Sequence, residues 1–199
     1  VDQEFLNKSG LKSEDELKKN LEQNFKSQYE NGLRQIEKKQ LMDTLEKEHS
    51  FDLPQGILDQ EFKDIWHRLE HAKKDGTIDE DDKKLTVEEL RKRYELISQR
   101  RVKLAILLQF IAKQHKIVVD EKELSNGMMQ YASQYPGQEK EIIDYFKKNP
   151  SSIESIRGPI LEDKVIKQII SQCNKIKSKV DKEAFEKLEK KVFDIKRNK

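Results

Sequence analysis

The sequence predicts an all-α fold, with the helices in an elongated body rather than a compact globule. Apolar side chains recur every three or four residues through most of the chain, which is the period of an amphipathic helix. Three of these segments open with Ser, Thr or Asp followed three residues later by Glu, the pattern of a capping box. Of the 199 residues, 34% are hydrophobic and 39% are charged, which favours a body with much surface per residue. The chain has only 7 Gly, 4 Pro and a net charge of +2, a composition that argues against disorder.

The first helix is expected to run from the capping box of Ser13 and Glu16 to about residue 49. Its apolar stripe consists of Leu17, Leu21, Phe25, Tyr29, Leu33 and Ile36. The next helix starts near Pro54, because proline fits the first helical turn, and Gly76 ends it. The segment 73–84 is polar and acidic and is expected to form a solvent-exposed loop.

Two further capping boxes, Thr86 with Glu89 and Asp120 with Glu123, open the next two long helices. The first of these is apolar on most sides over residues 102–112, so we expect this segment to be buried. No convincing strand pair interrupts the helices, and the short connections predict antiparallel helix pairs.

Prolines are expected to end or interrupt several helices in the second half of the chain. Pro136-Gly137 is expected to end the helix that Asp120 opens, and Asn149-Pro150 to stop a shorter helix after it. Ser151 or Ser152 is expected to cap the following helix, which Pro159 should kink or split.

The end of the chain carries one cysteine and a basic tail. Cys173 lies among isoleucines and is expected to be a buried small hydrophobe, and a last helix starts near Asp181. The excess of Lys and Arg gathers at 175–199, which indicates a solvated end rather than a nucleic-acid site. With balanced charge and no long apolar run, we expect no nucleic acid and no membrane partner.

Catalytic patterns are weak. His67, Glu70 and His71 match H-x-x-E-H, in which two histidines bind zinc and the glutamate activates water, but nothing specifies a third ligand. A calcium loop centred on Gly76 fails, because Lys73 would occupy a position that needs an oxygen ligand. The sequence therefore predicts no cofactor, no metal site and no enzyme, with a zinc protease as a remote alternative. Large side chains such as Trp66 suit the binding of apolar segments where they are exposed.

Five segments resemble the C-terminal domain of bacterial trigger factor. Residues 53–61, L-P-Q-G-I-L-D-Q-E, resemble the start of that family's first arm. R-R-V-K-L at 100–104, Y-P-G-Q at 135–138 and I-R-G-P-I-L-E-D-K-V at 156–165 are the most specific matches. Residues 1–10 resemble the segment that follows the family's isomerase domain.

The resemblance implies an ATP-independent, cytoplasmic chaperone whose helical body and two protruding arms form a cradle. It implies a body helix at 1–50, a first arm and return helix at 53–115, a second arm at 117–149, a body helix at 151–177 and a basic tail helix at 178–199. The family's ribosome-docking and prolyl isomerase domains are not in these residues, so we expect ribosome binding only through domains absent here.

The partners implied are unfolded or nascent polypeptides, with self-association also expected from exposed apolar faces. By resemblance, the client contacts fall on Met42, Ile57, Phe62, Ile65, Leu69, Met128, Tyr131, Tyr135, Ile142 and Phe146. The helical domain of a periplasmic chaperone of the SurA type is the alternative within the same function, and a passive helical scaffold is the alternative without it.

Overall fold

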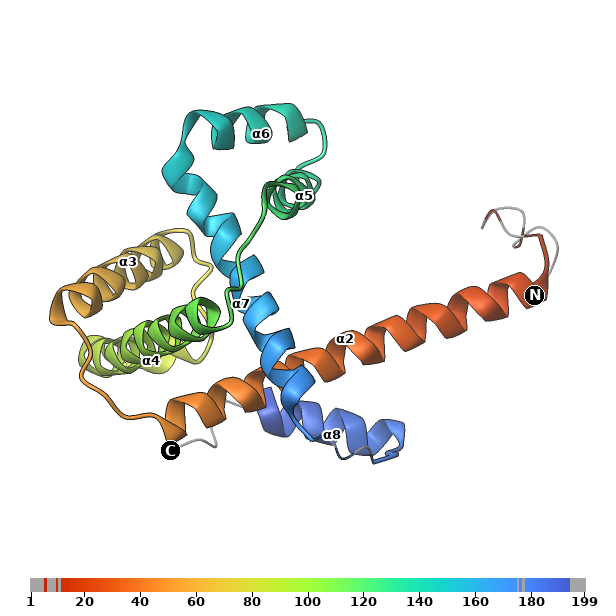
Figure 1. Ribbon diagram of the computed structural model, residues 1–199, viewed down its shortest axis with the longest axis horizontal. Coiled ribbons are helices and arrows are strands. Elements are labelled where there is room, and N and C mark those ends of the chain that lie inside the picture. The colour runs from red at the N-terminus through yellow and green to blue at the C-terminus, as the bar shows by residue number, and fades with distance from the viewer. Residues whose placement is uncertain (1–5, 7–9, 11, 175, 177, 194–199) are drawn as a thin grey trace. The chain divides into compact units, whose positions relative to one another are not determined.

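The computed structural model describes Leu6, Gly10 and residues 12–174, 176 and 178–193, and all of its regular elements are helices (Figure 1). Residues 1–5, on which part of the family resemblance rests, lie outside the described residues. The all-α prediction is confirmed. The α-helices are α2 (Glu14–Glu48), α3 (Gln55–Lys74), α4 (Val87–Gln114), α5 (Glu121–Ala132), α6 (Glu139–Lys148), α7 (Glu154–Gln172) and α8 (Lys182–Phe193). Two 3-10 turns join them, η1 (Asp82–Lys84) and η2 (Pro150–Ile153).

The chain divides into two compact units, one formed by residues 1–44 and 176–199 and the other by residues 45–175. In the first unit α8 packs on α2 through Phe185, whose ring meets Tyr29 edge-on with the centroids 5.2 Å apart. A Cβ on Gly32 would lie 3.1 Å from the same phenylalanine ring. The glycine in the middle of α2 therefore lets the two helices approach closely.

Local capping starts the helices as the sequence predicts, with one difference. Both remaining boxes are complete at α4 and α5, where Thr86 and Asp120 each exchange hydrogen bonds with the glutamate three residues on. At α2, Ser13 Oγ accepts from the Glu16 N–H at 3.2 Å, but the Glu16 carboxylate accepts from the Lys12 N–H instead of that of Ser13. Only one of the two hydrogen bonds of the capping box is therefore present at α2, and the Glu16 carboxylate caps the N–H of the residue before Ser13.

In the second unit α3 and α4 pack side by side as a helical hairpin (Figure 1). Ile65 and Leu69 are the buried residues of α3, and α4 buries Val102, Leu104, Leu107, Leu108 and Ala112 within the segment expected to be central. Gly76, at φ 70°, ends α3 as predicted. The next N–H, on Thr77, donates back to the Ala72 carbonyl at 2.9 Å, which closes the helix end.

The segment 73–84 is not the plain solvent-exposed loop that its polarity predicts. Asp82 is 4% exposed, and its carboxylate accepts a hydrogen bond from the Tyr94 hydroxyl at 2.6 Å and pairs with Arg93 at 2.9 Å. A buried carboxylate is stable only when it is paired, and α4 supplies both partners.

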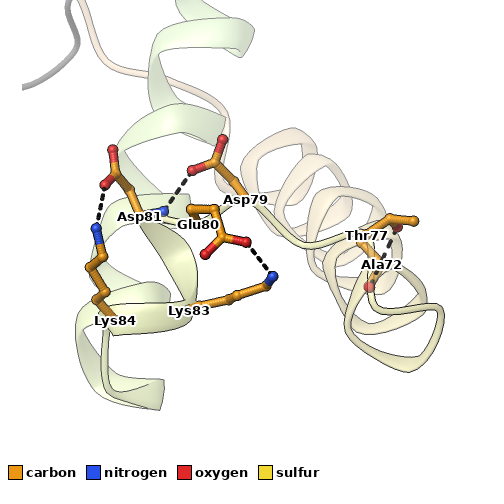
Figure 2. A network of polar contacts seen from close by, with 7 residues as sticks. All are labelled: Ala72, Thr77, Asp79, Glu80, Asp81, Lys83 and Lys84. Atoms are coloured by element: carbon orange, nitrogen blue, oxygen red, sulfur yellow. Dashed lines mark hydrogen bonds and ion pairs between the residues drawn. The ribbon is translucent and has the colours of Figure 1, made fainter.

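The rest of this loop is held by short-range polar contacts (Figure 2). The Asp81 N–H donates to Asp79 at 2.8 Å, Lys84 pairs with Asp81 at 3.3 Å, and Lys83 pairs with Glu80. The loop is therefore an ordered connection between α3 and α4.

The remaining helices of the second unit surround a small core of their own. Leu124 of α5, Phe146 of α6 and Ile156 of α7 form its centre, and partly buried hydrophobic residues pack around it. Those residues are Val119, Met128, Ile142, Ile153 and Ile160. α5 approaches α7 so closely at Gly127 that a Cβ there would lie 2.8 Å from Ile156 Cγ2.

The predictions about prolines and caps in this half were partly wrong. α5 ends at Ala132, before Pro136-Gly137. Neither Ser151 nor Ser152 caps α7, because the 3-10 turn η2 leads directly into it. α7 continues through Pro159, so the proline does not split the helix. The proline stands close to the helix start, where the one hydrogen bond it removes would have reached the Ser155 carbonyl.

The prediction of a buried Cys173 was also wrong, because this cysteine is exposed. α7 ends at Gln172, so the periodic stripe stops there and the backbone of Cys173 is extended. Ile176, which continues the same spacing in the sequence, is 97% exposed for the same reason.

Candidate apolar binding surface

The ten residues expected to contact a polypeptide differ widely in exposure. Ile65, Leu69 and Phe146 are buried in helix packing, at 6%, 5% and 4% exposure. Those of intermediate burial are Met42, Phe62, Met128 and Ile142. The exposed ones are Ile57, Tyr131 and Tyr135. Met42 belongs to the first unit, and the others fall on two places in the second unit, the α3–α4 hairpin and the α5–α6 region.

The clearest exposed aromatic surface lies on α5, α6 and the turn between them. Tyr131, Tyr135 and Tyr145, which we call the tyrosine patch, are 40%, 44% and 55% exposed. Tyr131 and Tyr145 lie against the buried ring of Phe146, with centroids 5.6 and 5.9 Å away, and Tyr135 lies 5.6 Å from Tyr131. Phe146 thus forms the floor of the patch, and the three tyrosines offer apolar rings to solvent.

Local structure holds these tyrosines in place. Tyr131 is in the last turn of α5, and the Tyr135 N–H donates to the Ala132 carbonyl at 3.0 Å, so the chain turns directly after the helix. Ser152 of η2 donates to the Tyr145 hydroxyl at 3.4 Å. The hydrogen bond with the Tyr135 side chain raises the pKa of Tyr131, which favours the neutral form of the Tyr131 hydroxyl.

The α3–α4 hairpin carries a second group of aromatic side chains, most of which are packed against neighbouring side chains of the hairpin. Phe62 stacks on Trp66 at 5.6 Å, and Trp66 meets Tyr94 edge-on at 6.4 Å. The Arg91 guanidinium lies 5.6 Å from the centre of the Phe62 ring, in the range of a cation–π contact. Only Ile57, at 52% exposure, stands open among the residues expected here.

Several strongly exposed hydrophobic residues were not among the expected contacts. Leu96 and Phe110 on α4 are 66% and 60% exposed, and Met129 on α5 is 53% exposed. In α2, Leu21, Phe25 and Leu33 of the predicted apolar stripe are also exposed. Leu96 and Phe110 stand off the apolar stripe of α4, and that departure from helical period is the signal that could have identified them.

Hydrogen bonds and ion pairs of charged side chains join the helices and links next to these surfaces. Lys164 of α7 donates to the Val118 carbonyl at 2.6 Å and to both oxygens of Glu123 at 2.7 Å. The Lys164 ammonium, and after it the Asp120 N–H, lower the pKa of Glu123. Lys103 of α4 donates to the Glu46 carbonyl at 2.7 Å, and Arg100 pairs with the Glu46 side chain. The link 117–119 is thereby fastened to α7, and the end of α2 to α4.

The histidines of the H-x-x-E-H segment lie on the exposed side of α3. The Nε2 atoms of His67 and His71 are 3.3 Å apart, and Glu70 accepts a hydrogen bond from the Trp66 ring N–H at 3.1 Å. Within the part of the chain that the structure describes, no group of three or more His, Cys, Asp or Glu side chains could hold a metal ion. The third ligand that a zinc protease needs is thus not found among these residues.

None of the described helices is both long enough and apolar enough to span a membrane.

Comparisons of the chain with a family model and with individual known proteins identify the same family. Residues 13–171 match the family described as "Bacterial trigger factor protein (TF) C-terminus". The chain is 35% identical over 185 residues to the trigger factor of Maricaulis maris, covering 93% of this chain and 36% of that protein. It is 37% identical over 172 residues to the trigger factor of Bartonella tribocorum, covering 86% of this chain and 36% of that protein.

A third relative, the trigger factor of Rhodospirillum centenum, is 36% identical over 172 residues, covering 86% of this chain and 38% of that protein. The chain thus spans between 36% and 38% of the length of these relatives. No solved structure matches the chain. The match covers most of the residues from which the helices are built, so the chain belongs to the bacterial trigger factor family and corresponds to its C-terminal region.

Proposed function

We propose that this chain is the client-holding part of an ATP-independent chaperone, which binds exposed apolar segments of unfolded or nascent polypeptides by reversible contact. The single observation that carries the proposal is the tyrosine patch, three exposed aromatic rings over the buried ring of Phe146. Membership of the trigger factor family supports it. A chaperone needs surfaces that bind many sequences, and aromatic rings on a hydrophobic floor bind without demanding one complementary shape.

The charged remainder of the surface suits the same role. The chain has 40 Lys and Arg against 38 Asp and Glu, so charged side chains of both signs, in nearly equal numbers, accompany the apolar patches. This surface keeps the chain and its bound client in solution, while the patches supply the binding energy. A client that folds buries its own apolar segments, so these segments no longer bind the patches and the client is released.

Of the expected contacts, the exposed residues Ile57, Tyr131 and Tyr135 are proposed as the principal ones. Met42, Phe62, Met128 and Ile142 contribute the surface that their partial burial leaves open, whereas Ile65, Leu69 and Phe146 support the surface from beneath. We assign residues 53–115 to a first arm and residues 117–149 to a second, with the body at 1–50 and 151–177 and a basic tail helix at 178–199.

The proposal places the chain in the cytoplasm, without a catalytic role of its own. Ribosome docking and prolyl isomerisation would belong to other parts of a longer protein. Family membership favours a trigger factor over the SurA type of periplasmic chaperone.

The test is suppression of aggregation. A chemically unfolded protein is diluted into buffer without ATP, and light scattering is followed with increasing amounts of the chain. We expect suppression by the wild-type chain, and we expect Y131S/Y135S/Y145S to need roughly ten-fold more protein for the same effect, since contact aromatics contribute about 1 kcal/mol or more in total when they are lost.

The matched control is V87S/L96S/F110S, which removes three exposed apolar side chains from α4. All six side chains are at least 40% exposed, so both variants should keep wild-type helicity, and their unfolding midpoints are measured so that the assay is run where both are folded. If the wild-type chain fails to suppress aggregation at molar excess, the chaperone proposal is wrong. If the two triple variants lose activity equally, holding is spread over the apolar surface and the assignment to the tyrosine patch is wrong.

A further inference from the structure

The two histidines of α3 form a close pair that the proposed function does not use. His67 and His71 are four residues apart, both side chains are exposed, and their Nε2 atoms lie 3.3 Å from each other. The ring centroids are 4.4 Å apart and the ring planes meet at 69°. One turn of helix therefore presents two ring nitrogens side by side, as residues at this spacing do.

The separation of the nitrogens fits a tetrahedral metal ion. A zinc ion bound 2.0 to 2.1 Å from two nitrogens that are 3.3 Å apart has an N–Zn–N angle of about 107°, close to the tetrahedral value. The two Nε2 atoms lie within hydrogen-bond distance of each other, and which of them donates depends on the tautomer. Where one Nε2 carries the hydrogen, moving that hydrogen to Nδ1 of the same ring leaves a lone pair on each Nε2 for a metal.

We propose that His67 and His71 form a two-histidine chelate for a borderline divalent transition ion, with zinc as the ion that the geometry fits best. Solvent fills the remaining coordination positions, because both histidines are exposed and no third His, Cys, Asp or Glu joins them among the described residues. The site is thus open, unlike a closed structural zinc site with four protein ligands. It differs from the zinc protease alternative, because Glu70 is engaged by Trp66 and no catalytic step is assigned to the ion.

Binding at this site would act on α3 itself. The ion bridges positions 67 and 71 only while the turn between them is helical, so it binds the folded chain in preference to the unfolded chain. Zinc is therefore expected to stabilise the hairpin. Magnesium and calcium prefer oxygen ligands and are expected to have no effect.

The experiment titrates the 199-residue chain with zinc chloride by isothermal titration calorimetry and follows the thermal midpoint in parallel. We expect one saturable zinc ion per chain, a midpoint that rises with zinc, and no response to magnesium chloride. H67Q and H71Q should each bind zinc roughly a hundred-fold more weakly, because a single imidazole lacks the chelate effect of two ligands held at a fixed spacing on one helix. H115Q removes a histidine distant in sequence from the pair and should bind like the wild-type chain.

Two variants with unchanged histidine number separate chelation from a general attraction of histidines for zinc. R68H/H71Q keeps four histidines but places the pair at adjacent positions, which face different directions on a helix, so it should bind as weakly as H71Q. K63H/H71Q rebuilds the four-residue spacing on the other side of His67, with Lys63 exposed, and should restore tight binding.

The proposal is overturned if H71Q or R68H/H71Q binds zinc as tightly as the wild-type chain, or if K63H/H71Q binds no better than H71Q. Circular dichroism of each variant without metal establishes that α3 is intact. All substituted side chains are exposed, so no loss of folding is expected.

Discussion

Gly127 is the residue at which α5 and α7 come closest. A Cβ added there would lie 2.8 Å from Ile156 Cγ2 and 2.9 Å from Ile160 Cδ1. The Ile160 methyl is the end of a flexible side chain, but Cγ2 of Ile156 is attached to a β-branched carbon that can move little. Ile156 also belongs to the core with Leu124 and Phe146, so a displaced isoleucine disturbs the floor beneath the tyrosine patch.

We therefore predict that G127A destabilises the chain by about 1 kcal/mol, measured as the free energy of unfolding in urea. Overpacking costs roughly 1 to 3 kcal/mol and the better helix propensity of alanine returns up to about 1 kcal/mol. The matched control is G56A in α3, where an added Cβ meets nothing within 4 Å. That variant should be as stable as the wild-type chain or slightly more stable, and equal stabilisation of both variants would show that the close approach at Gly127 has no energetic weight.

Single residues were predictable from the sequence where neighbours along the chain decide their state. Thr86 and Asp120 form caps because their partners are three residues away, and Gly76 adopts a positive φ because a helix must end there. Asp82 and Cys173 were not predictable in this way. The burial of Asp82 depends on Arg93 and Tyr94 in the next helix, and the exposure of Cys173 depends on where α7 stops.

At the scale of elements, the connection between α3 and α4 includes a hydrogen bond to a buried charge. The Tyr94 hydroxyl donates to Asp82 at 2.6 Å. Burial, and after it the hydrogen bond to the Asp82 carboxylate, raises the pKa of Tyr94 to about 12. Both causes favour the neutral phenol, so the folded chain holds this proton more tightly than the unfolded chain does.

We predict that Y94F destabilises the hairpin by about 1 to 3 kcal/mol at neutral pH, because Asp82 loses a donor while it stays buried. The contribution of a raised pKa is complete below the unfolded value near 10 and is lost as the pH rises through about 12. The difference in unfolding free energy between the wild-type chain and Y94F should therefore be constant up to pH 10 and shrink above it.

Two measurements test this prediction. Urea unfolding of both chains at several pH values gives the difference directly, and phenolate absorbance should show a component near pH 12 that Y94F lacks. A wild-type chain whose five tyrosines all titrate near 10 would contradict the buried contact.

Helices could be predicted from the sequence more completely than the faces they present. The spacing of apolar residues located α2 to α8 within a few residues, because helical period is a local property. The same spacing located the apolar stripe of α2 without deciding its burial, and Leu21 and Phe25 of that stripe are exposed, because burial requires a partner that periodicity does not supply. For the candidate surface the residue types were therefore predictable, while the division into exposed tyrosines and the buried Phe146 required the packing of α5, α6 and α7.

At the scale of the whole molecule, nearly balanced charge and exposed apolar side chains lead to one expectation about salt. A net charge of +2 over 199 residues gives little long-range attraction to a client of either sign. If apolar contact holds clients, raising the ionic strength removes nothing essential, since salt screens charges and does not weaken hydrophobic association.

We predict that aggregation suppression by the wild-type chain is unchanged or improved when sodium chloride is raised from roughly 50 mM to 500 mM, over which the Debye length falls from above about 10 Å to about 4 Å. Light scattering of the client alone at each salt concentration corrects for the effect of salt on the client itself. Y131S/Y135S/Y145S should remain defective at both concentrations, because its loss is one of apolar surface. A steep loss of suppression by the wild-type chain at the higher salt would mean that charge, through the basic segment 175–199 for example, holds the client, and the apolar mechanism would then be wrong.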